Sequence, residues 1–532
     1  MHAVIRSAAL CGLDPVPVQI EVSMTNGLPA FHIVGLPDAA VRESRERVVS
    51  ALRESGLEFP LRRVTANLAP AHLRKEGSAF DLPIALAVLA ASGQIPAERA
   101  RGWLVVGELA LDGRLRAVRG GLAYAECARA LGADALVLPS ACEREARLVP
   151  GIRVVSGERL SDIVGWLRGG EEALSARSPG PATESVGVPV APPTSGSRDA
   201  VILDDIAGQE HAKRALEVAA AGGHNLVLVG PPGSGKTMLA RALPSLLPSL
   251  TAEEALEVTR IQSVAGLLAR SRAPALVETR PFRAPHSSIS IAGLLGGGSV
   301  PRPGEITLAH HGVLFLDELP EFRRDALEAL RAPLETGTVT VVRASGAYRF
   351  PARFQFVAAF NPCPCGNLGH PKKGCRCGPD TVRRYRARVS GPLLDRIDLQ
   401  LEVPALSARE LARFRRARVG AHGGFGTPEQ AEAVVRVARA RERQLARASR
   451  LGLDAPWNAW LTPGELEVVA ALDERARALL GASMEQLGLS ARAYHRIWRI
   501  ARTVADLEGE DDLREIHLGQ AVGFRALDRP AG

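Results

Sequence analysis

The sequence predicts an α/β fold: a phosphate-binding parallel sheet with an α/β domain before it and helices after it. A glycine-rich run at residues 230–237 (GPPGSGKT) lies between the apolar residues 225–229 and a helical pattern at 238–243. A second apolar run, Val313–Leu316, ends in two carboxylates. Such strand–helix alternation is typical of parallel sheets. A Pro-, Ser- and Gly-rich stretch at 171–200 separates this region from the residues before it.

Residues 1–168 form the first expected domain, with strands at 18–22 and 30–34 and helices at 38–54 and 80–91. Three stretches, residues 74–81, 107–114 and 120–123, resemble the Lon protease (S5-like) domain. Lon-like peptidases use a Ser–Lys dyad, whose positions match Ala79 and Ala123 here. Ser78 lies one residue away, so a helix start would turn its hydroxyl about 100° from the required direction. The resemblance therefore implies an inactive domain that serves in assembly or DNA contact.

Residues 169–200 are expected to be a flexible linker because they lack the apolar surface needed to offset ordering entropy. The second domain, residues 201–404, carries the glycine-rich run. Residues 405–532 are expected to be mostly helical, with apolar spacing of three and four at 428–439 and 493–507. Thr462 followed by Pro463 predicts a helix start within this third domain.

The glycine-rich run matches the phosphate-binding P-loop, whose backbone N–H groups surround a triphosphate. Lys236 is expected to reach the β- and γ-phosphates, and Thr237 and Asp317 to hold Mg²⁺. Glu318 is expected to orient and deprotonate the attacking water. The pattern predicts a Mg²⁺-dependent ATPase whose nucleotide-binding residues are Gly230, Pro231, Pro232, Gly233, Ser234, Gly235, Lys236, Thr237 and Asp317.

Longer motifs follow the P-loop in a fixed order: residues 280–286 (RPFRAPH), 296–299, 303–306, 310–320 and 361–366 (NPCPCG). This order resembles the AAA+ ATPases of the branch that contains magnesium chelatase and the MCM helicases. Within that branch the chain resembles the ComM/YifB group of magnesium-chelatase-like proteins over nearly its whole length. The resemblance implies an AAA+ P-loop core at 201–404 and a helical lid at 405–532.

The resemblance also implies roles for three further residues. Asn361 would be the sensor-1 residue that positions the lytic water, and Arg492 the sensor-2 arginine on the lid. Arg396 would be an arginine finger that reaches the γ-phosphate of a neighbouring subunit, which implies a ring, most simply a hexamer. The alternatives are that Arg396 pairs with Asp395 or Asp398 and that Arg492 is a surface residue.

Two insertions are visible in the core. Residues 286–303 resemble the helix-2 insert of this branch, and residues 338–354 alternate as two strands around a turn, like the presensor-1 hairpin. Arg343, Tyr348 and Arg349 on this hairpin would contact backbone phosphates and stack on bases of single-stranded, forked or branched DNA. An ordinary exposed hairpin is the alternative.

Four cysteines form a C-x-C-x₉-C-x-C pattern in the loop 363–377: Cys363, Cys365, Cys375 and Cys377. Four thiolates from two close pairs can complete a tetrahedral Zn²⁺ site. His370 is a spare candidate ligand. An iron–sulfur cluster and four unligated thiols are the alternatives.

The composition limits the possible classes of protein but does not identify one of them. The chain has 532 residues, 46% of them hydrophobic and 23% charged, with a net charge of +8. We expect no signal peptide and no membrane-spanning segment, hence a cytoplasmic protein. The basic charge fits a polyanionic partner or a solvated surface equally well.

Three functions are compatible with these motifs. The first, which the resemblance to ComM-type proteins implies, is an ATP-driven hexameric DNA motor that unwinds or branch-migrates recombination intermediates in natural transformation. The second is a chelatase-like ATPase that remodels a protein partner. The third, an ATP-dependent protease, is opposed by Ala79 and Ala123.

Overall fold

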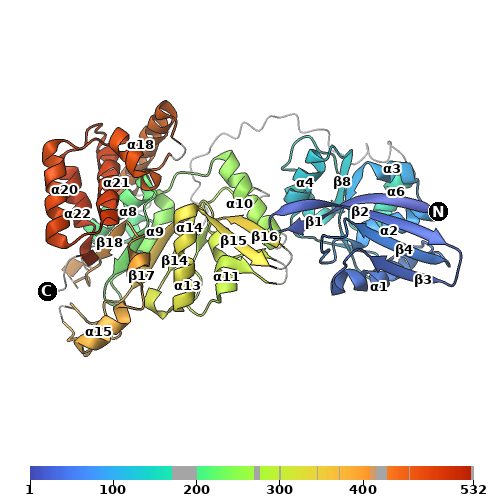
Figure 1. Cartoon of the computed structure of the whole chain (residues 1–532), viewed down its shortest axis with the longest axis horizontal. Helices are drawn as coiled ribbons and strands as arrows, with labels where there is room; N and C mark the ends of the chain where they lie inside the picture. The colour runs from blue at the N-terminus through green and yellow to red at the C-terminus, as the bar shows by residue number, and fades with distance from the viewer. Residues whose placement is uncertain are drawn as a thin grey trace.

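The computed structural model describes residues 1–169, 201–268, 276–298, 301–343, 346–370, 372–407, 409–410, 412, 414, 428–453 and 456–528. The expected linker 169–200 lies outside these residues except for Gly169. Figure 1 shows the N-terminal α/β domain at one end of the molecule and the second α/β domain with its helices at the other. No helix among the described residues is both long and apolar enough to cross a membrane.

The N-terminal domain is built on a seven-stranded mixed sheet with the order β3-β4-β2-β1-β5-β8-β9. The strands are β1 His2–Cys11, β2 Asp14–Thr25, β3 Ala30–Val34, β4 Arg63–Ala69, β5 Trp103–Val105, β8 Ala135–Pro139 and β9 Val154–Gly157, beside a small ladder of β6 Glu108–Leu109 and β7 Leu115–Arg116. Strands β1 and β2 form a long antiparallel hairpin in which Ile5 is opposite Ile20. Both side chains are buried, as alternation along a half-covered strand requires.

Helices α1 Ala39–Glu54, α2 Asp81–Ala91, α3 Ala97–Arg101, α4 Gly121–Ala130, α5 Glu143–Ala146 and α6 Leu160–Gly169 complete this domain. The helix expected at 38–54 is confirmed, with Asp38 as its N-cap accepting from the Val41 N–H at 2.7 Å. Every residue of α2 is buried, because its sequence is apolar on all sides apart from Asp81.

The second domain contains a five-stranded parallel sheet with the order β11-β14-β17-β10-β18. Its strands are β10 Leu226–Val229, β11 Phe282–Arg283, β14 Val313–Leu316, β17 Gln355–Phe360 and β18 Leu399–Glu402. The three central strands are buried along their whole lengths, which explains their unbroken apolar runs. Helices α8 Glu210–Gly222, α9 Lys236–Leu246, α10 Ala252–Ala265, α12 Glu305–Leu308, α13 Arg324–Ala329, α14 Arg331–Thr336, α15 Pro379–Arg386 and α16 Gly391–Leu394 surround the sheet.

Both expected insertions have structure of their own. The first contains α11 Ile291–Leu295 and a two-stranded ladder of β12 Gly296–Gly297 and β13 Arg302–Pro303. The second is the expected hairpin, formed by β15 Thr338–Arg343 and β16 Gly346–Pro351. Residues 344–345 at its turn lie outside the described part of the chain.

The C-terminal region is helical, as expected, with α18 Pro428–Leu451, α19 Pro463–Val469, α20 Glu474–Leu487, α21 Ala491–Glu508 and α22 Glu515–Gly523. Thr462 caps α19 in a capping box with Glu465, which confirms the predicted helix start. Side chains from α18 and α21 share one hydrophobic core with α8 and α9. The helical C-terminal region is therefore packed directly on the second domain.

The N-terminal domain docks on α10 of the second domain. Arg260 forms ion pairs with Asp14 at 2.6 Å and Glu126 at 3.3 Å, and the Gly120 N–H donates to the Ser263 carbonyl at 3.1 Å. Leu13, in the β1–β2 turn, is buried in the core of the second domain. The linker sequence gave no sign of this contact.

Candidate functional site

The P-loop joins the carboxyl end of β10 to the start of α9, the geometry that the strand–glycine–helix pattern predicts. A Cβ atom on Gly230 would lie 2.2 Å from the Val403 carbonyl oxygen, so only glycine fits at this position. The loop thus presents backbone rather than side chains, as phosphate binding requires.

Lys236 is buried at the first turn of α9, with 8% of its surface exposed. Its Nζ donates to the Gly230 and Pro231 carbonyls at 2.7 and 3.0 Å, and to Asn361 Oδ1 at 3.2 Å. Burial lowers the pKa of Lys236, against the opposing effect of Asp317 and Glu318. The structure therefore brings the expected sensor, at the end of β17, to the P-loop lysine.

Asp317 and Glu318 follow β14 directly. The Thr237 hydroxyl donates to Asp317 Oδ2 at 2.8 Å, so the two oxygens are placed to share one Mg²⁺. Glu318 has φ of 54°, a left-handed conformation that a non-glycine residue adopts at a cost of about 1–3 kcal/mol. Such strain is common at catalytic positions and fits the expected role of Glu318.

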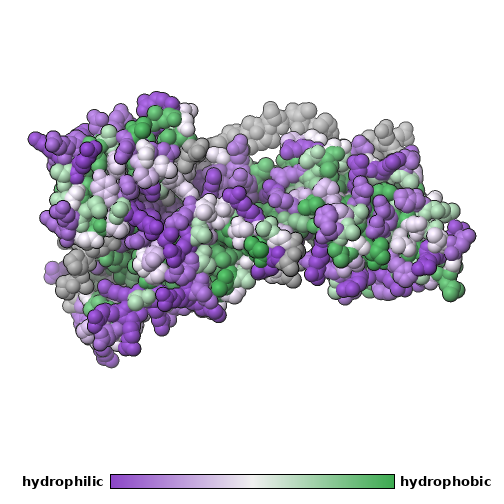
Figure 2. Space-filling model, in the orientation of Figure 1, coloured by the Kyte–Doolittle hydropathy of each residue, from purple (hydrophilic) through white to green (hydrophobic). Residues whose placement is uncertain are grey.

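Helix α15 supports the sensor edge, a feature that sequence reasoning missed. Tyr385 is buried there, and burial raises its pKa to about 12, with Glu321 adding to the rise. Arg386 donates to the Pro362 carbonyl at 3.1 Å, and Arg388 contacts Glu321 at 3.3 Å. Arg386 thus holds the loop that follows Asn361, and Arg388 holds the segment that follows Glu318. Figure 2 shows the hydrophilic surface over α15 at the lower left.

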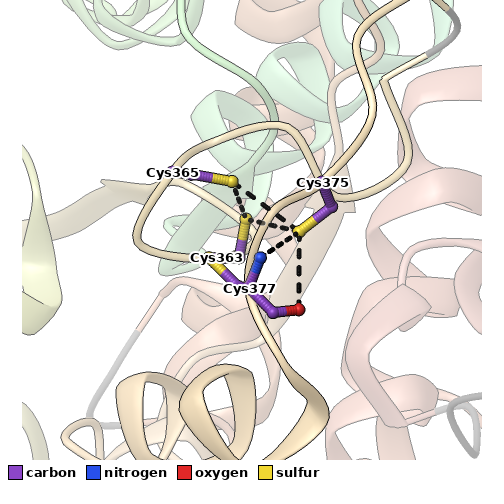
Figure 3. Close-up of side chains that lie close together, drawn as sticks. All are labelled: Cys363, Cys365, Cys375 and Cys377. Atoms are coloured by element: carbon purple, nitrogen blue, oxygen red, sulfur yellow. Dashed lines mark hydrogen bonds between the residues drawn. The ribbon is translucent and has the colours of Figure 1, made fainter.

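The four loop cysteines converge, and Figure 3 shows their sulfur atoms gathered around one point. The Sγ atom of Cys363 lies 3.4 Å from that of Cys365 and 3.6 Å from that of Cys375, and Cys365 and Cys375 are 3.7 Å apart. With Cys377 included, all four sulfurs lie within 4.8 Å of one another, and none forms a disulfide. Four thiolates at Zn–S distances of about 2.3 Å would be roughly 3.8 Å apart. The donor set fits a single tetrahedral ion.

His370 is not part of this cluster. Its Nδ1 accepts from the backbone N–H groups of Lys372 and Lys373, at 3.0 and 3.1 Å. The cysteine loop instead reaches the P-loop, since a Cβ on Gly366 would lie 2.6 Å from Pro232 Cδ. The loop that carries the cluster is therefore in contact with the P-loop.

Arg396 and Arg492 line one cavity of about 330 Å³, which also contains Gly223 and Asn225. Asn225 precedes β10, whereas the P-loop follows it, so the cavity lies at the amino edge of the parallel sheet. The four residues of β10 separate the two edges by roughly 13 Å. The structure brings the two expected arginines to each other and not to the P-loop of their own chain.

Arg396 is 7% exposed and donates to the Pro392 carbonyl at 2.6 Å. It forms an ion pair with Glu335 at 2.5 Å. Neither Asp395 nor Asp398, the partners considered from the sequence, is bonded to it among the described residues. Arg492 is exposed at the start of α21.

The hairpin lies against the first insertion, because Arg343 Nε donates to the Gly298 carbonyl at 3.3 Å. Arg343 and Arg349 are exposed. Tyr348 is half-buried beside Gly12 of the β1–β2 turn, where a Cβ would lie 3.4 Å from its ring. The N-terminal domain thus covers part of the ring expected to stack on bases.

The positions that match a Ser–Lys dyad are both alanine, and Ala123 faces the second domain. Ala123 is fully buried in a cluster with Ile261 and Val264 of α10, and Ala79 packs at the edge of a neighbouring cluster. The Ser78 hydroxyl is hydrogen-bonded to Glu108, which also forms an ion pair with Arg116 at 3.4 Å. No lysine contacts Ser78 among the described residues.

Comparison with protein families matches three consecutive parts of the chain. Residues 202–411 match the family described as magnesium chelatase, subunit ChlI, and residues 20–142 match subunit ChlI of Mg-chelatase. Residues 428–525 match the ChlI C-terminal family. These matches cover the N-terminal domain, the core and the lid in order.

Individual relatives extend over the whole chain. A protein named competence protein ComM from Haemophilus influenzae is 43% identical over 527 residues, which is 99% of this chain and 98% of the relative. A protein named YifB from Escherichia coli is 42% identical over 529 residues, covering 99% and 97%. An archaeal Lon protease from Archaeoglobus fulgidus is 42% identical over 55 residues, or 10% of this chain and 9% of the relative. This partial match supports the likeness of the N-terminal domain to Lon.

Proposed function

The chain belongs to the ComM/YifB family of magnesium-chelatase-like AAA+ ATPases, and from this premise we propose that it is a hexameric DNA motor driven by ATP hydrolysis. The motor would unwind or branch-migrate recombination intermediates during natural transformation. The Haemophilus influenzae relative is named a competence protein, and competence is the uptake of DNA by cells. That name supports DNA as the polymer on which the motor acts.

The observation that carries the proposal is the position of Arg396 and Arg492 at the amino edge of the sheet. An arginine there cannot reach its own P-loop, which lies beyond the far end of β10. In a ring, the amino edge of one copy faces the nucleotide of the next, so both arginines would act on the neighbour's γ-phosphate. Glu335 would hold Arg396 until a neighbour's phosphate replaces it.

Within each site, the chain's own residues supply the remaining steps. Lys236 would bind the β- and γ-phosphates after leaving its carbonyl partners. Thr237 and Asp317 would hold Mg²⁺, which draws charge from the phosphate oxygens. Glu318 and Asn361 would orient the attacking water, with Glu318 accepting its proton.

DNA contact is assigned to the hairpin and the insertion beside it. Arg343 and Arg349 are exposed cations on an element tied to the glycine-rich ladder, so both insertions can project together. Tyr348 would become available for stacking only if the N-terminal domain moves away from Gly12. Cations of this kind give DNA binding a steep inverse dependence on salt.

The cysteine cluster is proposed to bind Zn²⁺ through Cys363, Cys365, Cys375 and Cys377. Sulfur atoms close enough to surround one ion favour a mononuclear site over an iron–sulfur cluster, whose ligands bind separate irons. The bound ion would brace the loop between Asn361 and α15, next to Pro232 of the P-loop.

The decisive experiment is branch migration of a synthetic four-way junction and unwinding of a forked duplex by the purified protein with ATP. We expect activity that Lys236→Ala abolishes, ATPase turnover stimulated by DNA, and nucleotide-dependent hexamers seen by mass photometry. Arg396→Ala should retain ATP binding but lose turnover by on the order of 10³-fold. A protein that stays monomeric with ATP and whose turnover ignores added DNA would contradict the proposal.

A second candidate is a remodelling ATPase that acts on a protein partner, as a chelatase subunit does. It is favoured by one observation, the match of all three parts of the chain to ChlI families. Turnover that is unaffected by DNA but stimulated by a purified chelatase partner would favour this candidate.

A further inference from the structure

The cavity at the amino edge of the sheet holds more positive charge than two expected arginines explain. Arg396 and Arg492 are joined in its lining by Arg496 and Arg499, whereas the carboxylates of the lining are Glu335 and Asp398. The last three arginines come from α21 at spacings of four and three, which places them on one face of the helix.

Two of the four guanidinium groups are matched by carboxylates. Arg396 pairs with Glu335, and Arg496 pairs with Asp398, which is itself 2% exposed. Burial favours the protonated form of Asp398, but Arg496, His224 and the more distant Arg499 outweigh it and hold its pKa well below the usual range. The Asp398 carboxylate is thus already engaged by Arg496, His224 and the Asn225 N–H.

Arg499 has no carboxylate at ion-pair distance among the described residues, although Asp398 and Glu465 act on it electrostatically from farther away. Its side chain makes no hydrogen bond and no ion pair with any residue that the structure describes, and its Nε is buried without an acceptor. Burial lowers its pKa, which reports the cost of holding this cation away from water. A guanidinium whose Nε is buried without an acceptor is unfavourable unless a ligand supplies that acceptor.

We propose that Arg499 is a third phosphate-binding arginine, which contacts the triphosphate of ATP held by the neighbouring copy. This inference rests on the proposed ring, because no phosphate of its own chain can reach the amino edge. A guanidinium offers two parallel N–H donors to phosphate oxygens, and the cavity already holds Arg396 and Arg492 for the same anion.

The first test compares Arg499→Gln with Arg499→Lys and with Arg477→Gln, an exposed arginine on α20 as the control. We expect Arg499→Gln to lower the ATPase kcat about 10- to 100-fold, with Arg499→Lys recovering part of it. Binding of ATP to the variant's own P-loop should be unchanged, and ATP-dependent assembly should weaken. Thermal unfolding of each variant shows whether the fold is intact.

The second test asks whether Arg499 of one subunit acts on the nucleotide bound to its neighbour. Equimolar mixing of Arg499→Gln with Lys236→Ala creates seams at which an intact P-loop meets an intact Arg499, about a quarter of all seams in a head-to-tail ring. Turnover of the mixture should therefore exceed the average of the two variants measured separately. The parallel mixture of Arg396→Ala with Lys236→Ala shows whether any residue of this cavity acts across the seam.

The outcomes separate the inference from the proposed function. Recovery in both mixtures supports Arg499 as a phosphate ligand. Recovery with Arg396→Ala but not with Arg499→Gln overturns the role of Arg499 and leaves the ring in place. Recovery in neither mixture refutes action in trans altogether. An Arg499→Gln protein with unchanged kcat also overturns the inference.

Discussion

Replacing Cys375 by serine should remove the metal from the cysteine loop. The Sγ atom of Cys375 lies 3.6 Å from that of Cys363 and 3.7 Å from that of Cys365. The substitution therefore removes one of the four ligands expected for a tetrahedral ion. These separations differ from the roughly 3.8 Å of a Zn–thiolate tetrahedron by only a few tenths of an ångström. Little reorganisation is then needed to bind zinc, and the loss of one ligand should lower affinity by on the order of 10²-fold or more.

The assay is elemental analysis of protein purified without chelators, followed by zinc release to a colorimetric chelator. We expect one zinc per chain in the unaltered protein and in Cys11→Ser, an isolated cysteine that serves as the matched control. Cys375→Ser should contain much less than one. Because the loop touches Pro232, the zinc-depleted protein should also show a raised KM for ATP. Protein with neither zinc nor iron, or Cys375→Ser with a full complement of zinc, would refute the reasoning.

The remaining predictions concern DNA binding, the cavity and the loop contact. Arg343→Ala combined with Arg349→Ala should weaken DNA binding, measured by fluorescence anisotropy. The slope of log K against log salt concentration should become shallower by about 1.5. An unchanged slope would exclude the hairpin as a phosphate contact. Asp398→Asn should lower stability by about 3–5 kcal/mol, because it leaves a buried guanidinium uncompensated. Since the folded pKa of Asp398 is depressed, its stabilisation is present above the unfolded pKa of about 3.9 and is lost as pH falls through the lower folded value. The difference in free energy of unfolding between the unaltered protein and Asp398→Asn, measured by thermal unfolding, should therefore be constant from pH 7 to 5 and shrink below about pH 4. Gly366→Val should raise the KM for ATP several-fold, because its side chain would displace Pro232, and a KM equal to that of the unaltered protein would show that the contact has no effect on the nucleotide.

The features that the sequence predicted correctly depend on residues close together along the chain. The strand, glycine-rich loop and helix of the P-loop occupy one continuous segment, so periodicity and loop chemistry suffice to locate them. The same holds for the hairpin at 338–354, for the cap at Thr462 and for the paired cysteines, whose spacing within each pair is fixed by the backbone.

The features that could not be predicted arise where distant segments meet. Tyr385 carries no motif, and its place behind Asn361 depends on how α15 folds back from the cysteine loop. The shared cavity of Arg396 and Arg492 depends on the packing of α21 across the amino ends of the strands. Docking of α4 on α10 likewise depends on two surfaces separated by more than a hundred residues, including the linker.

The parallel direction of the strands separates the P-loop from the arginine cavity. All four pairings in the second sheet are parallel, so every carboxyl end lies at one edge and every amino end at the other. The nucleotide residues occupy the first edge, and the arginines occupy the second. No rotation of the lid removes this separation, because Arg396 precedes β18 within the sheet itself. If Arg396 assists hydrolysis, it must therefore do so from a second copy of the chain, so altering the arginine cavity should slow turnover while leaving ATP binding to the chain's own P-loop intact.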